Sequence, residues 1–166
     1  MAVERIGFGG GCHWCTEAVF QSLRGVAQVE QGHIASTPPY DRYSEAVIVH
    51  FDPDQIPQTA LIEAHLHTHA SASEHSMRHK YRSAIYCFDD AQTARARDAL
   101  KNLQADFAAP LVTQVLPFVA FKASDARFHD YYTSHPERPF CRTYIVPKLR
   151  RLEARLGDRM ASSEQT

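Results

Sequence analysis

Residues 5–20 read RIGFGGGCHWCTEAVF, a short apolar segment that runs into three glycines and then into a helical pattern. Residues 5–8 predict a strand, and Gly9-Gly10-Gly11 predicts a tight turn, because glycine enters turn conformations at little cost. A helix over 13–24 is expected next, since apolar residues recur there at the spacing of one helix face. The turn therefore delivers Cys12 to the start of a helix.

The rest of the chain alternates strand-like and helix-like segments. Predicted strands cover 26–34, 46–49, 81–88 and 112–123, and predicted helices cover 58–69, 90–107 and 125–132. Beyond residue 136 the pattern is irregular until Pro147, which suits the first turn of a final helix. The first six elements thus run β-α-β-β-α-β, the order of the ferredoxin-like split β-α-β unit. We therefore expect an α+β fold, a ferredoxin-like two-layer sandwich with extra C-terminal elements.

Length and composition bound the class of protein. The chain has 166 residues, the size of one domain, and no stretch rich in glycine, serine or proline divides it. We expect one domain over 1–159 and a disordered tail over 160–166 that has nothing to bury. No apolar run approaches the ~20 residues of a membrane helix, and no export signal opens the chain, so a cytoplasmic protein is expected. The net charge of -1 gives no reason to expect a nucleic-acid or membrane partner.

Cys12 is the strongest candidate for chemistry. At a helix start, unpaired backbone N–H groups and the positive end of the helix dipole stabilise a thiolate, which is the nucleophilic form of cysteine. The alternative is a buried cysteine that serves as a small hydrophobe. Three preceding glycines would add nothing to such packing, and so they favour a reactive thiol.

Cys12-x-x-Cys15 leaves two further interpretations open. The pair could be a redox couple of the thioredoxin kind, or half of a zinc site completed by histidines. No second Cys-x-x-Cys exists, which weakens the zinc interpretation. Cys15 also falls on the apolar stripe of the predicted helix, which favours core packing for its side chain.

Histidines are unusually frequent, with ten in the chain. His65 and His69 share one helical face at the spacing of a two-histidine metal pair, and His75 and His79 follow. Neutral, hydrogen-bonded histidines are the simpler interpretation, so we expect no resident metal.

Three segments resemble the peptide methionine sulfoxide reductase A family. Residues 11–17, GCHWCTE, resemble its Gly-Cys-Phe-Trp-x-x-Glu signature. Residues 44–53, SEAVIVHFDP, resemble the family's Glu-Ala-Val strand and the Asp-Pro that ends it. Residues 80–86, KYRSAIY, are similar to the family's Gln-Tyr-Arg-Ser-Ala-Ile-Tyr. The resemblance spans about residues 5–141 and identifies the chain as a divergent member.

The resemblance implies an enzyme that reduces methionine-S-sulfoxide, free or in proteins, as in the repair of oxidative damage. Cys12 would attack the sulfoxide sulfur and become a sulfenic acid. Glu45 would supply a proton from a carboxyl whose pKa is raised by partial burial. Tyr81 and Tyr40 would hydrogen-bond the sulfoxide oxygen.

The resemblance also implies a pocket and a recycling thiol. Trp14, with His13 beside it, would hold the S-methyl group. Cys141 would resolve the sulfenic acid as a Cys12–Cys141 disulfide, and its irregular, Pro-rich surroundings predict a mobile loop. Thioredoxin or a small dithiol would reduce that disulfide, so a monomer without a bound cofactor is expected.

Departures from the family pattern predict altered substrate positioning around unchanged Cys12 chemistry. His13 replaces phenylalanine, Ser76 replaces aspartate, and the second strand reads Gly32-His33-Ile34 where Gly-Tyr-x-Gly-Gly is usual. The segment between Tyr40 and Glu45 is also short. Three alternatives stay open: a disulfide oxidoreductase that uses Cys12-x-x-Cys15, a His/Cys metal-binding module, and a sulfoxide-binding protein without turnover.

Overall fold

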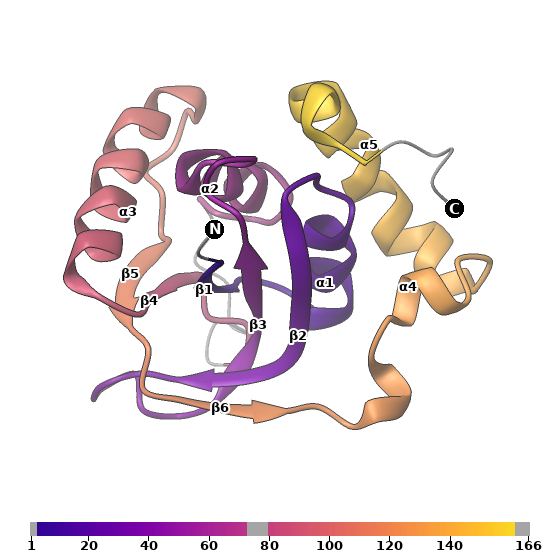
Figure 1. The fold of residues 1–166 in the computed structure, drawn as a ribbon, viewed down its shortest axis with the longest axis horizontal. Coiled ribbons are helices and arrows are strands. Elements are labelled where there is room, and N and C mark those ends of the chain that lie inside the picture. The colour runs from indigo at the N-terminus through magenta and orange to yellow at the C-terminus, as the bar shows by residue number, and fades with distance from the viewer. Residues whose placement is uncertain (1–2, 73–79, 162–166) are drawn as a thin grey trace.

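The computed structural model of the chain describes residues 3–72 and 80–161 (Figure 1). Within these residues six strands form one sheet in the order β5-β4-β1-β3-β2-β6. Neighbouring strands are antiparallel except for β4 and β5, which are parallel. The strands are β1 (Glu4–Gly9), β2 (Val26–Ala35), β3 (Ser44–Phe51), β4 (Ala84–Cys87), β5 (Gln114–Pro117) and β6 (Ala120–Ala123).

Helices cover the sheet and extend the fold at its C-terminal end (Figure 1). The helices are α1 (His13–Gln21), α2 (Gln58–His67), α3 (Asp90–Leu103), α4 (Tyr131–Ser134) and α5 (Val146–Leu156). Short 3-10 turns lie at Gln104–Asp106, Ala126–Phe128 and Gly157–Arg159, and a π-helical turn lies at Cys141–Ile145. The β-α-β-β-α-β order expected from the sequence is therefore present in a mixed α+β fold.

The central strand β3 is buried on both faces. Val47, Val49 and Phe51 pack in one apolar cluster with side chains of α1, α2, α3 and α5. Ala46 and Ile48 point to the other face and pack in a second cluster with residues of β2, β4 and β5. Because alternate residues of a strand point to opposite faces, a strand buried on both sides reads as a continuous apolar run.

The sequence predicted one long strand over 112–123, and this prediction is wrong. The chain breaks at Phe118 and Val119, so that β5 pairs with β4 and β6 pairs with β2 at the other end of the strand order. The end of β2 and β6 run across the lower end of the sheet (Figure 1), and Val119 N–H donates to the Ala35 carbonyl at 3.2 Å. An apolar run cannot reveal such a change of partner, because both halves have the same strand-like composition.

The C-terminal end also differs from expectation. The final helix α5 begins at Val146 with Pro147 in its first turn, as expected, but a π-helical turn at Cys141–Ile145 leads directly into it. Met160 was assigned to a disordered tail, but it forms a β-bridge with Leu23 and packs against the core. The rest of the expected tail, residues 162–166, lies outside the described residues.

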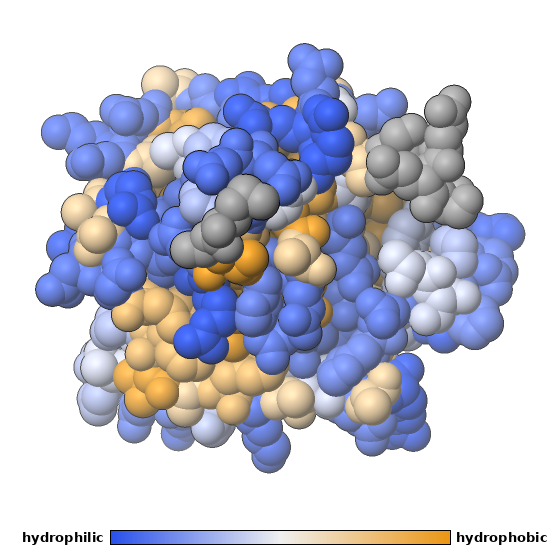
Figure 2. Space-filling view, in the orientation of Figure 1, coloured by the Kyte–Doolittle hydropathy of each residue, from blue (hydrophilic) through white to orange (hydrophobic). Residues whose placement is uncertain are grey.

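The surface in the orientation of Figure 1 is largely hydrophilic (Figure 2). Apolar residues gather at its lower left, where Figure 1 places the connection between β5 and β6. Val119, in that connection, is 54% exposed. In the described part of the chain, no helix combines the length and the apolar character needed to cross a membrane.

Ser44 fastens the segment 80–82 to the start of β3. Its buried hydroxyl donates to the Lys80 carbonyl at 2.8 Å and accepts the Arg82 N–H at 2.8 Å. The Glu45 N–H donates to the same Lys80 carbonyl at 3.0 Å. Residue 81 is therefore held next to Glu45 by backbone contacts.

Ser44→Ala should lower the free energy of unfolding by about 1–3 kcal/mol, since the Arg82 N–H would lose its buried acceptor. Urea unfolding followed by circular dichroism measures the change. Ser134→Ala, at an exposed position of α4, is the matched control and should stay within about 0.5 kcal/mol. Equal effects of the two substitutions would contradict the role given to Ser44.

Candidate active site

Cys12 is the N-cap residue of α1, where the glycine turn was expected to place it. Its carbonyl accepts the N–H groups of Cys15 and Thr16, both at 3.1 Å, and these bonds start the helix. Its side chain is partly exposed. The thiol thus stands at the positive end of the helix with a route to solvent.

The glycines before Cys12 allow close approach. Among the described residues only Gly25 has a positive φ among the glycines, so Gly9 and Gly10 are not required for a left-handed turn. A Cβ at Gly9 would lie 3.0 Å from the carbonyl oxygens of both Arg82 and Glu45. A Cβ at Gly10 would overlap the ring of His69. Because Gly9 and Gly10 have no side chain, these neighbours can pack directly against the β1–α1 turn.

The Cys12 thiol is acidic. A hydrogen bond from the Cys15 thiol, supported by the Trp14 N–H, lowers the pKa of Cys12 to about 7 although burial and the Glu45 charge oppose this. About half of Cys12 is therefore thiolate near neutral pH. The hydrogen bond to Cys12 and burial raise the pKa of Cys15, so Cys15 stays protonated and remains a donor.

Cys141 lies in the same cluster as Cys15, with Cys12 packed at its edge. It is fully buried in the π-helical turn, and its sulfur faces the His135 carbonyl at 3.6 Å. Burial raises the pKa of the Cys141 thiol. Cys141 therefore lies in a helical turn rather than in an irregular segment, while the residues just before it, 135–138, are irregular or in a turn.

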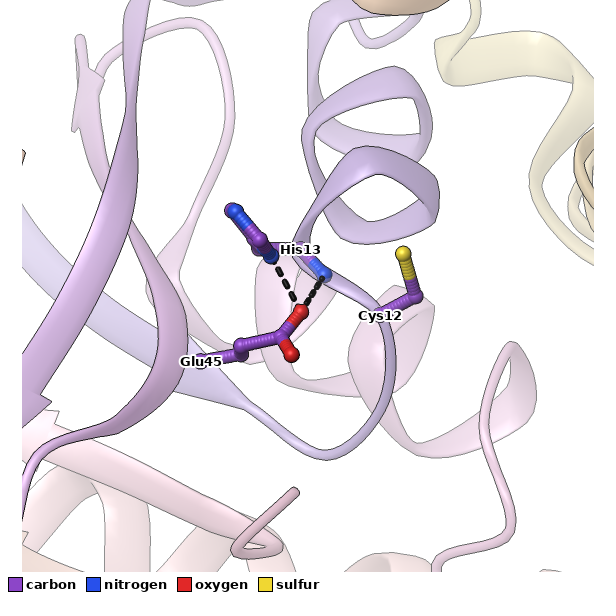
Figure 3. Close-up of side chains that lie close together, drawn as sticks. All are labelled: Cys12, His13 and Glu45. Atoms are coloured by element: carbon purple, nitrogen blue, oxygen red, sulfur yellow. Dashed lines mark hydrogen bonds and ion pairs between the residues drawn. The ribbon is translucent and has the colours of Figure 1, made fainter. Parts of the chain in front are cut away.

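Glu45 contacts the start of α1 from β3 (Figure 3). Its Oε1 accepts the backbone N–H of His13 at 3.2 Å and contacts the His13 Nδ1, and Lys80 Nζ lies 3.6 Å from its Oε2. The Cys12 sulfur, a His13 ring nitrogen and a Glu45 carboxylate oxygen all lie within 4.8 Å of one another. A carboxylate and the candidate nucleophile thus face the same small volume.

The expected rise in the pKa of Glu45 is wrong. Burial does raise this pKa, since the residue is only 6% exposed. The hydrogen bonds and charge of His13, with the charge of Lys80, outweigh burial and hold the pKa of Glu45 below its usual value. The sequence expectation took account of burial but could not show that His13 would bond to this carboxylate.

Tyr81 and Tyr40 are placed differently. Tyr81 is half-buried and follows Lys80, whose carbonyl accepts the Glu45 N–H. The Lys80 ammonium lies 5.1 Å from the centre of the Tyr81 ring. The Tyr40 hydroxyl oxygen accepts from Gln114 at 2.7 Å, and its ring packs in the second apolar cluster. The contacts of Tyr40 therefore do not join it to Cys12 and Glu45 as was expected.

Trp14 is part of an aromatic cluster that packs α1 against the C-terminal segment. Its ring stacks on Tyr131 with 4.3 Å between centroids and contacts Phe128 and Phe140 at 5.3 and 5.2 Å. Trp14 and His13 line one largely apolar pocket of about 450 Å³, with Phe128 and residues of β2 and β6. The structure thus brings the two predicted pocket residues together.

The histidines of α2 bond to neighbouring segments. His65 Nε2 contacts the Gly9 carbonyl at 2.7 Å, and His69 Nε2 contacts the Ser83 hydroxyl at 2.8 Å. These contacts, rather than a shared ligand, account for their spacing. His75 and His79, like Ser76, lie outside the described residues.

A second group of metal-ligand side chains is found on the surface. Glu63, His67 and Asp106 bring ligand atoms within 4.8 Å of one another. Arg155 forms ion pairs with both carboxylates, which disfavours a cation there.

Sequence reasoning missed Ser44, Lys80 and the role of Cys15. The i, i+3 spacing of Cys12 and Cys15 was a usable signal for their contact. Ser44 and Lys80 carry no comparable signal, because their roles depend on the pairing of two distant segments.

Comparisons with known proteins agree on one family. The family model described as "Peptide methionine sulfoxide reductase" matches residues 4–160. Peptide methionine sulfoxide reductase MsrA of Deinococcus radiodurans is 35% identical over 175 residues, which cover 96% of this chain and 85% of that protein.

Solved structures share the fold. Mxr1 from Saccharomyces cerevisiae in reduced form matches with a TM-score of 0.75 and 17% identity, covering 86% of this chain and 91% of that chain. Mxr1 in complex with Trx2 matches with a TM-score of 0.62 and 18% identity, covering 78% of this chain and 84% of that chain.

Cys15→Ala should raise the pKa of Cys12 from about 7 toward its ordinary value of 9.0, because the thiol donor is lost. The pH dependence of Cys12 alkylation by iodoacetamide, located by mass spectrometry, measures this pKa. Cys87→Ala, in β4, is the matched control and should leave it unchanged. The same midpoint in wild type and Cys15→Ala would show that Cys15 does not acidify Cys12.

Proposed function

The chain belongs to the peptide methionine sulfoxide reductase family, and we propose that it reduces methionine-S-sulfoxide, free or in proteins, through Cys12. The observation that carries this proposal is the acidic Cys12 thiol at the N-cap of α1, within 4.8 Å of the Glu45 carboxylate. In this arrangement Cys12 can reach the sulfur of a bound sulfoxide while Glu45 reaches its oxygen.

The first step transfers oxygen to Cys12. The thiolate attacks the sulfoxide sulfur, the sulfur–oxygen bond of the substrate breaks, and the oxygen ends on Cys12 as a sulfenic acid after taking up one proton. Methionine sulfur gains two electrons and the Cys12 sulfur loses two. Glu45 faces the departing oxygen, and Tyr81, held beside it through residue 80, supplies a hydroxyl donor.

Substrate positioning falls to the pocket lined by the two residues that follow Cys12 in the chain. Trp14 and His13 line it, and the stacked ring of Tyr131 fixes the indole in place. An aromatic wall suits the S-methyl group, because sulfur and methyl groups pack favourably against ring faces and edges. Tyr40 contacts Gln114 and the second apolar cluster instead, so we assign it no role in this step.

The second step regenerates the thiol. Cys141 attacks the Cys12 sulfenic acid, a disulfide forms between the two sulfurs, and water leaves. Their common cluster around Cys15 supports this pairing, and the complex of Mxr1 with Trx2 supports thioredoxin as the reductant of the disulfide. The buried position of Cys141 requires its turn to open before the disulfide reaches a partner. No bound cofactor enters this cycle.

Finer features of the protein fit the same proposal. The strand order β4-β1-β3-β2 supports a ferredoxin-like core, extended by β5 and β6. A cycle that starts from a free Cys12 thiol suits a reducing compartment such as the cytoplasm. The disulfide oxidoreductase and metal-binding alternatives are not favoured by the family match.

Cys141→Ser should still form one equivalent of methionine per enzyme without reductant, because Cys12 alone performs the oxygen transfer. Turnover with thioredoxin should fall by at least about tenfold, since the sulfenic acid then has no resolving thiol. Methionine release by chromatography and the Cys12 adduct by mass spectrometry measure the two effects.

Cys15→Ala is the control and should keep the Cys12–Cys141 disulfide after one turnover. A Cys12–Cys15 disulfide in wild type would contradict this resolving scheme. Absence of methionine formation in wild type would overturn the proposed function itself.

A further inference from the structure

We propose that His13 supplies the proton consumed in sulfoxide reduction and delivers it through Glu45. The inference rests on the proposed function and assigns a role to a residue that stands where the family motif has phenylalanine. Glu45 remains the group that faces the substrate oxygen, and His13 acts behind it.

Geometry ties the two residues into one unit. The ring Nδ1 and the backbone N–H of His13 both contact Oε1 of Glu45 (Figure 3). Oε2 receives no contact from His13 and has Lys80 Nζ at 3.6 Å. His13 therefore contacts one carboxylate oxygen only, and the sulfoxide oxygen can approach the carboxyl on the Oε2 side, next to the Lys80 ammonium.

The ionised state of Glu45 explains why a second group must supply the proton. His13 and Lys80 hold the pKa of Glu45 below its usual value, so the carboxyl is ionised near neutral pH. An ionised carboxylate has no proton to give, yet the departing oxygen must receive one. The imidazole ring that is hydrogen-bonded to this carboxylate can hold a proton and release it to the carboxylate.

The ring of His13 also lines the solvent-open pocket beside the site. Water in a pocket of about 450 Å³ can reprotonate the imidazole after each turnover. The pocket holds His33 as well, whose ring lies 5.3 Å from that of His13. Burial and the charge of His13 lower the pKa of His33, so His33 stays neutral near neutral pH.

The groups that surround His13 are of mixed charge. The titratable groups near it are Cys12 on its own element, His33 on β2, Tyr43 and Glu45 at the start of β3, Lys80, Lys122 on β6, and Asp125. Among these only Glu45 has a hydrogen bond to the His13 ring in the described structure.

The proton balance of the step is simple. The His13 imidazolium gives its Nδ1 proton to Oε1 of Glu45. Rotation of the carboxyl then turns this protonated oxygen toward the substrate, and the same proton passes to the sulfoxide oxygen. That proton ends on the oxygen of the Cys12 sulfenic acid, while both electrons come from the Cys12 thiolate. His13 is left neutral until solvent restores its proton.

His13→Gln tests the inference, because the amide keeps a donor to Glu45 but cannot release a proton. Single-turnover methionine formation is measured without reductant from about pH 5 to about pH 9. The ratio of wild-type to variant rates should be about 100 or more near pH 8 and should fall toward one near pH 5. Loss of the His13 charge lets burial raise the pKa of Glu45 in the variant, so that its carboxyl brings its own proton in acid. The pKa of Cys12 in each protein, from alkylation, corrects for its ionisation.

His50→Gln, a histidine of β3 that contacts Glu30 and lies outside this pocket, is the matched control and should keep the wild-type profile. His13→Ala provides a second readout: added imidazole should restore its rate near neutral pH, because the pocket is open to a small molecule. A rate ratio that does not change with pH, or no rescue by imidazole, would overturn the inference while wild type still turns over. A wild type that forms no methionine would instead overturn the proposed function.

Discussion

The contact between Glu45 and the first residue of α1 is the constraint on which the site depends. It joins β3 to the start of the helix, and so it fixes where Cys12 lies relative to a carboxylate. The same contact sets the charge of that carboxylate, because His13 outweighs the effect of burial. The His13–Glu45 pair thus determines both the position of Cys12 relative to the carboxylate and the ionisation of that carboxylate.

Around this pair, two neighbouring segments are held by close backbone approach and by the short side chain of Ser44. Gly9 brings the β1–α1 turn against the carbonyls of Glu45 and Arg82, and Ser44 fastens the segment that carries Tyr81. Backbone contacts leave little rotamer freedom, which suits a site that must place an oxygen and a sulfur atom at once. The cysteine cluster, by contrast, is packed in an apolar interior beneath α1.

Sequence reasoning succeeded where a feature is local. The position of Cys12 follows from glycines and helix periodicity within a few residues, and the β-α-β-β-α-β order follows from similar patterns. It failed where a feature depends on distant pairing: the His13–Glu45 bond spans 32 positions, and the path of Tyr40 depends on Gln114. The prolines before Cys141 suggested an irregular loop through that residue, whereas the irregular stretch ends at residue 138 and Cys141 begins a π-helical turn.

The two strands at the margins of the sheet, β5 and β6, are only four residues long. β5 ends in Pro117, which has no N–H to offer, and β6 carries the charged Lys122. Short edge strands that contain proline or lysine pair poorly with a strand from another molecule. The architecture therefore resists self-association into aggregates, a useful property for a protein that would work among oxidised and partly unfolded chains.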